Sequence, residues 1–418
     1  MQWECAIPLS LAEELNASPF KQGLIGFPFV TSIPDSDCFH GVAHENIVND
    51  AALDLAEGKK VQFWCECLSQ LLTESHVKMR GSDSVTELNY WRKIYTDSCL
   101  LRGISQFTLG HTLNGIATLD QALIIAGGYG RRHTLWDVIL KMQSKLPVPS
   151  LPSSRALPFI QKITSPVFVQ DTVPEIQPPS FLSFQFELAK RPFILRKFAS
   201  NWPALNDRPW RSAAYLRAIA GPGRVVPVEV GRDYRESDWQ QKIMEWDAFL
   251  STLDFDDQPA TQHRNDMIYL AQHDLTLQFP SLLEDILIPD YVYASLTSED
   301  FPAYSQPVND KNMLFNSWLG PKGTLSPAHT DPYFNCYVQV VGTHSELSID
   351  SSDQLVNTSR VDVFSGLLGT EDFPDYVRNV TPISMTAVLH PGDVLFFPPG
   401  WWHAMRSETT SFSFSIWF

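Results

Sequence analysis

The proline-rich stretch from Pro147 to Pro179 is the feature that most constrains the fold of this chain. It holds eight of the thirty prolines in the 418-residue sequence. Proline fixes its own φ angle, has no backbone N–H and restricts the residue before it, so a dense run of prolines discourages both helices and strands. We therefore interpret residues 146–179 as a linker between two parts of different structure.

The part before the linker has the periodicity of helices. Apolar residues recur three or four positions apart in DAALDLAEGKKVQFWCECLSQLL, TELNYWRKIYTDSCLLRGISQF, TLDQALIIAGG and HTLWDVILKMQSKL. This spacing places apolar side chains on one face of a helix. Residues 1–145 are predicted to form an all-α N-terminal domain.

The part after the linker has the composition of strands. RPFILRKF, VVPVEVG, MIYLAQ, YVQVVG and VLFFPP are short β-branched or aromatic runs bounded by Gly, Pro, Asp and Asn. Such runs are typical of strands. They do not alternate regularly with helices, which favours a barrel or a sandwich with appended helices over residues 180–418, and an α+β chain as a whole.

The charge balance restricts the partners of the chain. With 31 basic and 47 acidic residues its formal net charge is −16, which argues against direct nucleic-acid binding and against an anionic membrane surface. An acidic surface suits basic partners, such as peptides that contain Arg or Lys. We expect no signal peptide and no membrane span, and the six cysteines have no disulfide-framework spacing. Reduced thiols fit the nucleus, the cytoplasm or both.

Two residues of the segment SPAHTDPYFN suggest a metal site. His329 and Asp331 are two positions apart in a strand-like run, so their side chains point to the same face. An imidazole and a carboxylate side by side offer two ligands to a divalent ion. A third ligand from another strand would complete the two-His-one-carboxylate triad, which leaves positions of Fe(II) free.

His403 is the best candidate for the third ligand. It lies in LHPGDVLFFPPGWWHAMRS, where one tight turn leads into an apolar strand and a second turn precedes the histidine. An isolated His-x-Asp pair carries little weight among eleven histidines, and Asp-Pro is itself a turn signal. The combination of both motifs is more specific than either alone.

The two motifs resemble those of the jumonji-C family of Fe(II)/2-oxoglutarate oxygenases. NSWLGPKGTLSPAHTDPYFNCYVQVVG and LHPGDVLFFPPGWWHAMRSETTSFSFSIWF carry the resemblance, and RPFILRKFASNWPAL, VVPVEVGRDYRESDW and IYLAQHDL extend it over roughly residues 175–418. They are most similar to the branch known both for lysine demethylation and for arginyl C-3 hydroxylation. The resemblance implies a double-stranded β-helix, the cupin-like jelly roll of the JmjC domain, with Fe(II), 2-oxoglutarate and O2 as cofactor and cosubstrates. It makes His329, Asp331 and His403 the iron ligands and the catalytic centre.

The resemblance also assigns residues to 2-oxoglutarate. Tyr269, Ser326 and Asn335 match family positions in the cosubstrate pocket, and hydroxyl and amide groups are suitable donors to a carboxylate. His344 stands where the family has a lysine. Three alternatives follow: the cosubstrate carboxylate protonates His344, another donor replaces it, or cosubstrate binding is weak.

Three further residues match an arginine-binding pocket of the related hydroxylase. Glu229 would grip the guanidinium group, and Trp239 and Trp318 would cover its faces. The expected function is therefore hydroxylation of a protein side chain, with arginyl C-3 hydroxylation favoured. The expected substrates are basic proteins or peptides, with histones and ribosomal or chromatin proteins as candidates. The alternatives are histone N-methyl-lysine demethylation with the same iron chemistry and, because of His344, a catalytically weak JmjC-fold module that binds protein.

Overall fold

A computed structural model describes residues 42–147, 171–231, 239–260, 267–296, 301–302, 304–349, 358–359, 361–364 and 373–418. These residues form two compact units. The first holds the helices up to residue 147 together with Ala220–Val226 and Glu245–Asp247, and the second holds the other described residues. Most of the proline-rich segment, residues 148–170, lies outside the described residues.

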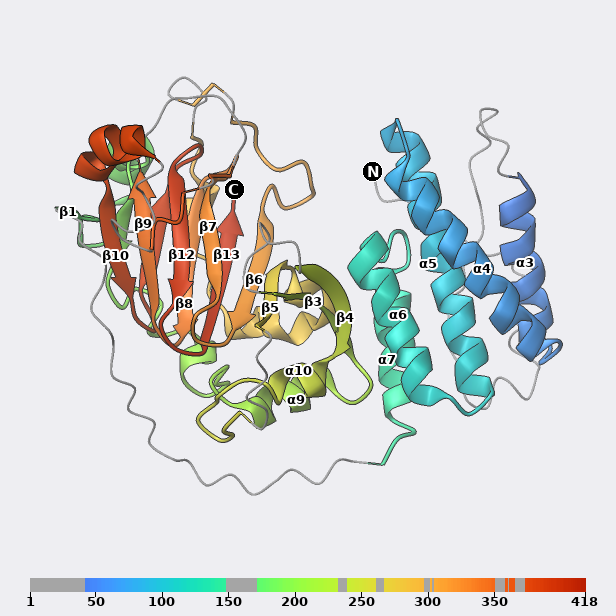
Figure 1. The fold of residues 1–418 in the computed structure, drawn as a ribbon. Helices are drawn as coiled ribbons and strands as arrows, with labels where there is room; N and C mark the ends of the chain where they lie inside the picture. The colour runs from blue at the N-terminus through green and yellow to red at the C-terminus, as the bar shows by residue number, and fades with distance from the viewer. Residues whose placement is uncertain are drawn as a thin grey trace. The chain divides into compact units, whose positions relative to one another are not determined.

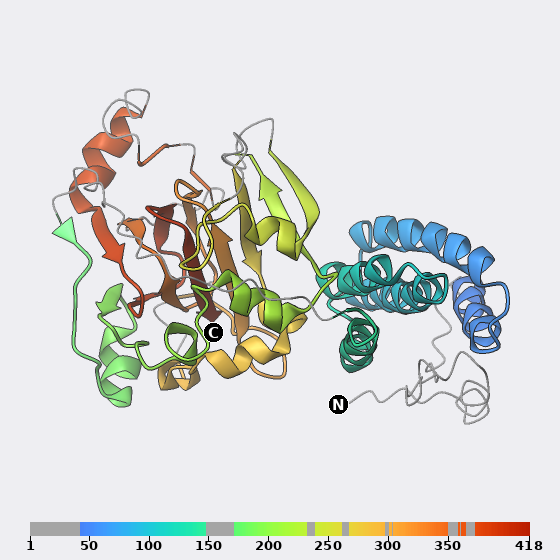
Figure 2. The ribbon, with the colours of Figure 1, turned by 90° about the horizontal axis from the view of Figure 1, so that it is seen from below.

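The first unit is built from consecutive helices, whose bounds are α3 (Val42–Ala56), α4 (Val61–Arg80), α5 (Val85–Thr108), α6 (Thr112–Ala126) and α7 (Arg132–Gln143). Figure 2 shows α4, α5 and α6 packed side by side. Helix α5 begins where the side chain of Ser84 accepts a hydrogen bond from the backbone N–H of Glu87. Helix α6 ends at Gly127, whose φ of 67° is the left-handed conformation that glycine adopts most easily. Among the described helices, none is both long and apolar enough to cross a membrane.

A buried ion pair fixes the segment Ala220–Val226 within the first unit. The Arg224 guanidinium donates to both carboxylate oxygens of Asp120 on α6, at 2.8 and 2.7 Å. The backbone N–H of Val225 donates to the same carboxylate at 2.9 Å. Both charged side chains are buried, and a buried ion pair of this kind needs such additional hydrogen bonds to offset its desolvation.

Two mainly antiparallel sheets make up most of the second unit, although Val225, Val226 and Glu245, at the ends of two strands, belong to the first unit (Figure 1). The five-stranded sheet has the order β1 (Asp171–Thr172), β10 (Met385–Leu389), β9 (His344–Ile349), β12 (Trp402–Ser407), β7 (Leu325–Thr330). The eight-stranded sheet has the order β2 (Phe193–Leu195), β11 (Val394–Phe397), β8 (Asn335–Val341), β13 (Ser411–Trp417), β6 (Leu314–Gly320), β5 (Ile268–His273), β3 (Val225–Val230), β4 (Gln240–Glu245). Short helices α8 (Phe181–Ser183), α9 (Ala213–Ala220), α10 (Trp246–Leu250) and α11 (Leu275–Gln278) occur between strands.

One apolar cluster joins the two sheets. Leu389 of β10 and Met405 of β12 come from the five-stranded sheet and pack with Leu395 and Phe397 of β11 and Tyr337 of β8 from the eight-stranded sheet. Strands β8 and β13 are buried along almost their whole length, which explains their near-continuous apolar or small-residue sequences. The site described below lies between these two sheets.

Two turns set the ends of strands that border the site. Gly342, between β8 and β9, has a φ of 76°, and a side chain there would meet the carbonyl oxygen of Thr410 at 2.0 Å, so only glycine fits. Before β11, the carboxylate of Asp393 accepts from the backbone N–H groups of Lys197 and His390, each at 2.9 Å, and from Arg196 at 2.6 Å. The predicted Pro-Gly-Asp turn is present, and its aspartate holds β11 against β2.

Candidate metal centre and adjoining cavity

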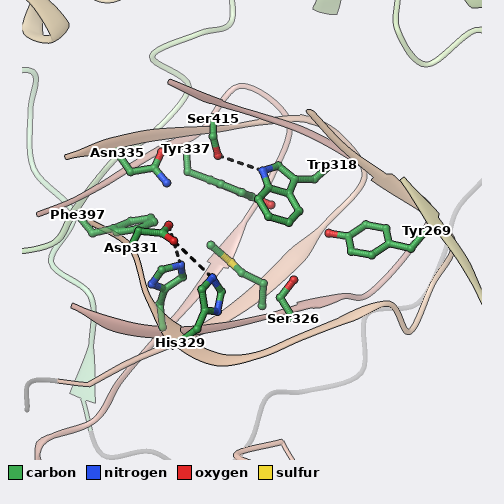
Figure 3. A pocket seen from close by; sticks show the side chains of 11 residues that line it. Tyr269, Trp318, Ser326, His329, Asp331, Asn335, Tyr337, Phe397 and Ser415 are labelled. Atoms are coloured by element: carbon green, nitrogen blue, oxygen red, sulfur yellow. Dashed lines mark hydrogen bonds and ion pairs between the residues drawn. The ribbon is translucent and has the colours of Figure 1, made fainter. Parts of the chain in front are cut away.

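The three predicted metal ligands converge at one edge of the five-stranded sheet. His329 lies in β7 and His403 in β12, where they are direct cross-strand partners with ring centroids 4.3 Å apart. Asp331 follows the end of β7 and turns back towards both rings (Figure 3). Its carboxylate oxygens lie 3.8 Å from His329 Nε2 and 3.5 Å from His403 Nε2. All three ligand atoms lie within 4.8 Å of one another.

Backbone carbonyls select the tautomer that a metal requires. His329 Nδ1 lies 2.7 Å from the carbonyl oxygen of Pro327, and His403 Nδ1 lies 3.1 Å from that of Trp401. A carbonyl oxygen can only accept, so each Nδ1 carries the proton and each Nε2 presents its lone pair to the centre. Metal-binding histidines are oriented by this kind of hydrogen bond.

Burial makes the cluster unfavourable without a cation. Desolvation raises the pKa of the Asp331 carboxyl, and the neighbouring His329 opposes that shift. Burial and then the proximity of His329 hold the pKa of His403 well below its ordinary value, against a smaller opposing effect of the Trp401 carbonyl. Two imidazole nitrogens and one poorly solvated carboxylate are a donor set that fits a divalent ion such as Fe(II).

Three of the four residues predicted to bind 2-oxoglutarate line the cavity next to this cluster. They are Tyr269 of β5, Ser326 of β7 and Asn335 of β8. Burial raises the pKa of the Tyr269 hydroxyl, and its hydrogen bond with Ser326 opposes that shift. Asn335 is buried, and among the described residues nothing pairs with its Oδ1. Such an orphaned buried atom is commonly satisfied by a water or a ligand.

The residues predicted to hold an arginine side chain form a chain of contacts that leads to the cavity. The indole N–H of Trp239 donates to the carboxylate of Glu229 at 3.2 Å. Glu229 of β3 is the cross-strand partner of Tyr269. The Tyr269 ring lies 6.3 Å from that of Trp318, which itself lines the cavity. All three predicted arginine-pocket residues are half-buried, so their polar groups and rings are partly accessible.

Comparison with known proteins identifies the family. Residues 178–418 match the cupin-like domain family. Lysine-specific demethylase 8 of Danio rerio is 34% identical over 351 residues, which cover 78% of this chain and 80% of that protein. The chain belongs to the cupin-like JmjC family. The family is one of Fe(II)- and 2-oxoglutarate-dependent oxygenases, so this JmjC chain is assigned to that enzyme class.

Other relatives support the same assignment. Jumonji C domain-containing protein 5 of Drosophila melanogaster is 37% identical over 278 residues, which cover 63% of this chain and 64% of that protein. Lysine-specific demethylase JMJ30 of Arabidopsis thaliana is 30% identical over 372 residues, which cover 79% and 80%. The predicted fold class, with helices followed by the sheets of a jelly-roll type, is confirmed.

His344 does not line the cavity of this JmjC domain. It is the first residue of β9 and is 3% exposed. Its Nδ1 lies 3.0 Å from Ser411 Oγ and 3.5 Å from the hydroxyl of Tyr337. Burial lowers the pKa of His344 to about 3, so its ring is neutral at physiological pH and cannot supply the cation expected at this position.

Sequence reasoning missed four lining residues, which are Tyr337, Phe397, Met405 and Ser415. Tyr337 and Ser415 are cross-strand partners on β8 and β13, and the Trp318 indole donates to Ser415 Oγ at 3.2 Å. The sequence carried one usable signal for Tyr337. It is two positions after Asn335 on the same strand, so both side chains point to the same face.

The cavity next to the metal ligands is small. Its volume is about 10 Å³, close to the minimum that holds a single water, whereas pockets for small molecules typically span roughly 300–1,000 Å³. The donor set therefore fits a metal ion, but the space beside it does not fit 2-oxoglutarate in this side-chain arrangement.

Proposed function

We propose that this JmjC chain is an iron-dependent protein oxygenase that hydroxylates an arginine side chain, most readily at C-3. The carrying observation is the convergence of His329, Asp331 and His403, with both Nε2 lone pairs directed at one point. Trp318 lines the adjoining cavity, and the bonded pair Glu229 and Trp239 is linked to it through Tyr269. Iron bound at this point, with O2 and 2-oxoglutarate, would supply the oxidising chemistry.

The residues of the chain would place the substrate. The Glu229 carboxylate can accept two hydrogen bonds from a guanidinium group, and the Trp239 N–H holds that carboxylate in place. Trp318 offers an aromatic face beside the cavity, which favours a cation held above it. An arginine gripped at its far end would present the carbons nearer the backbone to the metal, and positioning of this kind decides which C–H bond reacts.

The substrate we propose is a basic protein or peptide. The formal net charge of −16 favours encounters with basic partners. Histones and ribosomal or chromatin proteins have the required composition. We propose residence in the nucleus, the cytoplasm or both, where such substrates are found.

Two other functions are candidates, and the peptide assay below distinguishes them. Demethylation of N-methyl-lysine uses the same metal chemistry, and relatives from Danio rerio and Arabidopsis thaliana are named lysine-specific demethylases. A catalytically weak, protein-binding role is favoured by one specific observation, namely a neutral His344 outside a cavity of about 10 Å³.

A peptide assay separates these functions. The full chain is incubated with Fe(II), 2-oxoglutarate and air, and with either unmodified arginine-containing peptides or the same peptides carrying methyl-lysine. The proposal expects a mass gain of one oxygen on arginine, which Glu229→Gln reduces and the exposed control Glu245→Gln does not. Loss of a methyl group from lysine would mean that the chain is a demethylase and not an arginine hydroxylase. Neither product at saturating 2-oxoglutarate would favour the binding module.

A further inference from the structure

We propose that Tyr337 occludes the 2-oxoglutarate site and that the cosubstrate can enter only by displacing its ring. This inference deepens the proposed function, because it concerns access to the same metal centre. Tyr337 lies on β8, lines the cavity beside Trp318 and Ser415, and is 4% exposed (Figure 3).

The Tyr337 side chain extends from β8 towards Trp318 and borders the same cavity as the metal ligands (Figure 3). Its strand begins at Asn335, which lines the cavity, and continues with side chains of the same face at alternate positions. Its cross-strand partners are Leu395 of β11 and Ser415 of β13. The space left beside this ring holds about one water, so a dicarboxylate cannot share it.

Hydrogen bonds lock the Tyr337 ring in place. Its hydroxyl lies 2.5 Å from Ser413 Oγ, and His344 Nδ1 lies 3.5 Å from the same hydroxyl. His344 Nδ1 also lies 3.0 Å from Ser411 Oγ. These partners come from β9 and β13, so strands of both sheets hold the tyrosine. Moving the ring would leave buried polar groups without partners, which costs free energy.

Met405 is another bulky side chain that lines the cavity, and it can change conformation more easily than Tyr337. It lines the same cavity from β12. Methionine is unbranched and has several rotatable bonds, so it changes conformation at low cost. Tyr337 has a rigid ring and specific hydrogen bonds, so its displacement sets the resistance to cosubstrate entry.

The occlusion can be measured without turnover. Wild-type chain and variants are loaded with Mn(II), and metal uptake is followed by the loss of the free-ion electron paramagnetic resonance signal. 2-Oxoglutarate is then titrated into each metal-loaded protein, and its Kd is read from tryptophan fluorescence, since Trp318 borders the cavity. Tyr337→Ala is expected to bind 2-oxoglutarate about tenfold to hundredfold more tightly than wild type, because no ring has to be displaced.

Matched variants test how the ring acts. Tyr337→Phe keeps the ring and removes the hydroxyl, so it should bind 2-oxoglutarate as tightly as wild type or a few-fold more tightly. Ser413→Ala removes the partner of the hydroxyl and should have the same effect. Tyr293→Ala removes an exposed tyrosine, 60% accessible and outside the lining residues, and should leave the Kd unchanged. Mn(II) affinity should be equal in all of them.

Two results would overturn the proposal. One is equal 2-oxoglutarate affinity in wild type and Tyr337→Ala with Mn(II) bound. The other is weaker binding by Tyr337→Phe, which would make the hydroxyl an anchor for the cosubstrate. Tight binding by Tyr337→Ala without any arginine product would refute the proposed substrate and leave the occlusion intact. Efficient arginine hydroxylation by wild type at low 2-oxoglutarate would refute the occlusion and leave the proposed substrate intact.

Discussion

The two sheets of the jelly roll line one cavity but contribute different chemistry to it. The five-stranded sheet provides His329 and His403, with Asp331 at the end of a strand, and together they form a donor set for a cation. The eight-stranded sheet provides Trp318 and Tyr337, which fill space. A metal centre needs only a few correctly aimed atoms, whereas a cosubstrate site also needs volume. The metal centre can therefore be complete while the cosubstrate site beside it is closed.

The largest effect is expected on the metal side of this comparison. Asp331→Ala removes the only carboxylate of the cluster, so Co(II) affinity, followed by visible absorption, should fall by at least about 100-fold. Asp375→Ala, an exposed carboxylate with 85% of its side chain accessible, serves as the control and should bind Co(II) normally. Unchanged Co(II) binding by Asp331→Ala would mean that the three residues are not the metal centre.

A smaller effect, on the free energy of unfolding, is expected at His344, where the two sheets meet. In the folded chain burial lowers the pKa of His344 to about 3, whereas in the unfolded chain a histidine titrates near 6.5. The unfolded state therefore takes up a proton as the pH falls below about 6.5. The stability associated with a neutral His344 is full above that pH and is lost progressively towards pH 3, reaching a loss of about 2 kcal/mol at pH 5.

Urea unfolding at pH 8 and pH 5 measures this loss. His344→Gln cannot take up the proton, so the difference in unfolding free energy between the two pH values should be about 2 kcal/mol smaller in the variant than in wild type. His344→Lys would place a charge in the same buried position and should be destabilised at both pH values. An identical pH dependence in His344→Gln and wild type would show that the ring is not held neutral.

The smallest effect, on the affinity for an arginine-containing peptide, is expected at Glu229 on β3 of the eight-stranded sheet. Glu229→Gln keeps the shape of the side chain and removes its charge, so binding of an arginine-containing peptide should weaken by about tenfold. Isothermal titration with the Mn(II)-loaded chain measures this change. Co(II) affinity should be unaltered, which separates the arginine group from the metal centre. Equal peptide affinity in the variant and wild type would remove Glu229 from the proposed pocket.

Much of the metal half could be predicted from the sequence because it depends on local rules. The two-residue period of a strand places His329 and Asp331 on one face, and the Pro-Gly-Asp turn before β11 indicates the strand that precedes His403. The family resemblance assigned Glu229 and Trp239 to one arginine pocket, but their hydrogen bond was not predicted, since no local rule joins residues ten positions apart on a strand and in a loop.

Tyr337 and His344 show where local rules end. The sequence YVQVVG predicted a strand, and β8 covers it, but the pattern does not say that a tyrosine ring will take up the space in front of a metal cluster. For His344 the sequence left three alternatives open. The structure buries its ring beside Tyr337 and Ser411, outside the residues that line the cavity, and so leaves it neutral.

The sequence by itself determined which side chains can bind a metal and on which strands they lie, because ligand chemistry and strand periodicity are properties of short segments. Only the tertiary structure decided the size of the adjoining cavity and the charge of His344. Cavity volume and desolvation arise from side chains of β6, β8, β12 and β13 packing together, and strands as far apart in the chain as β6 and β13 meet only in the folded protein.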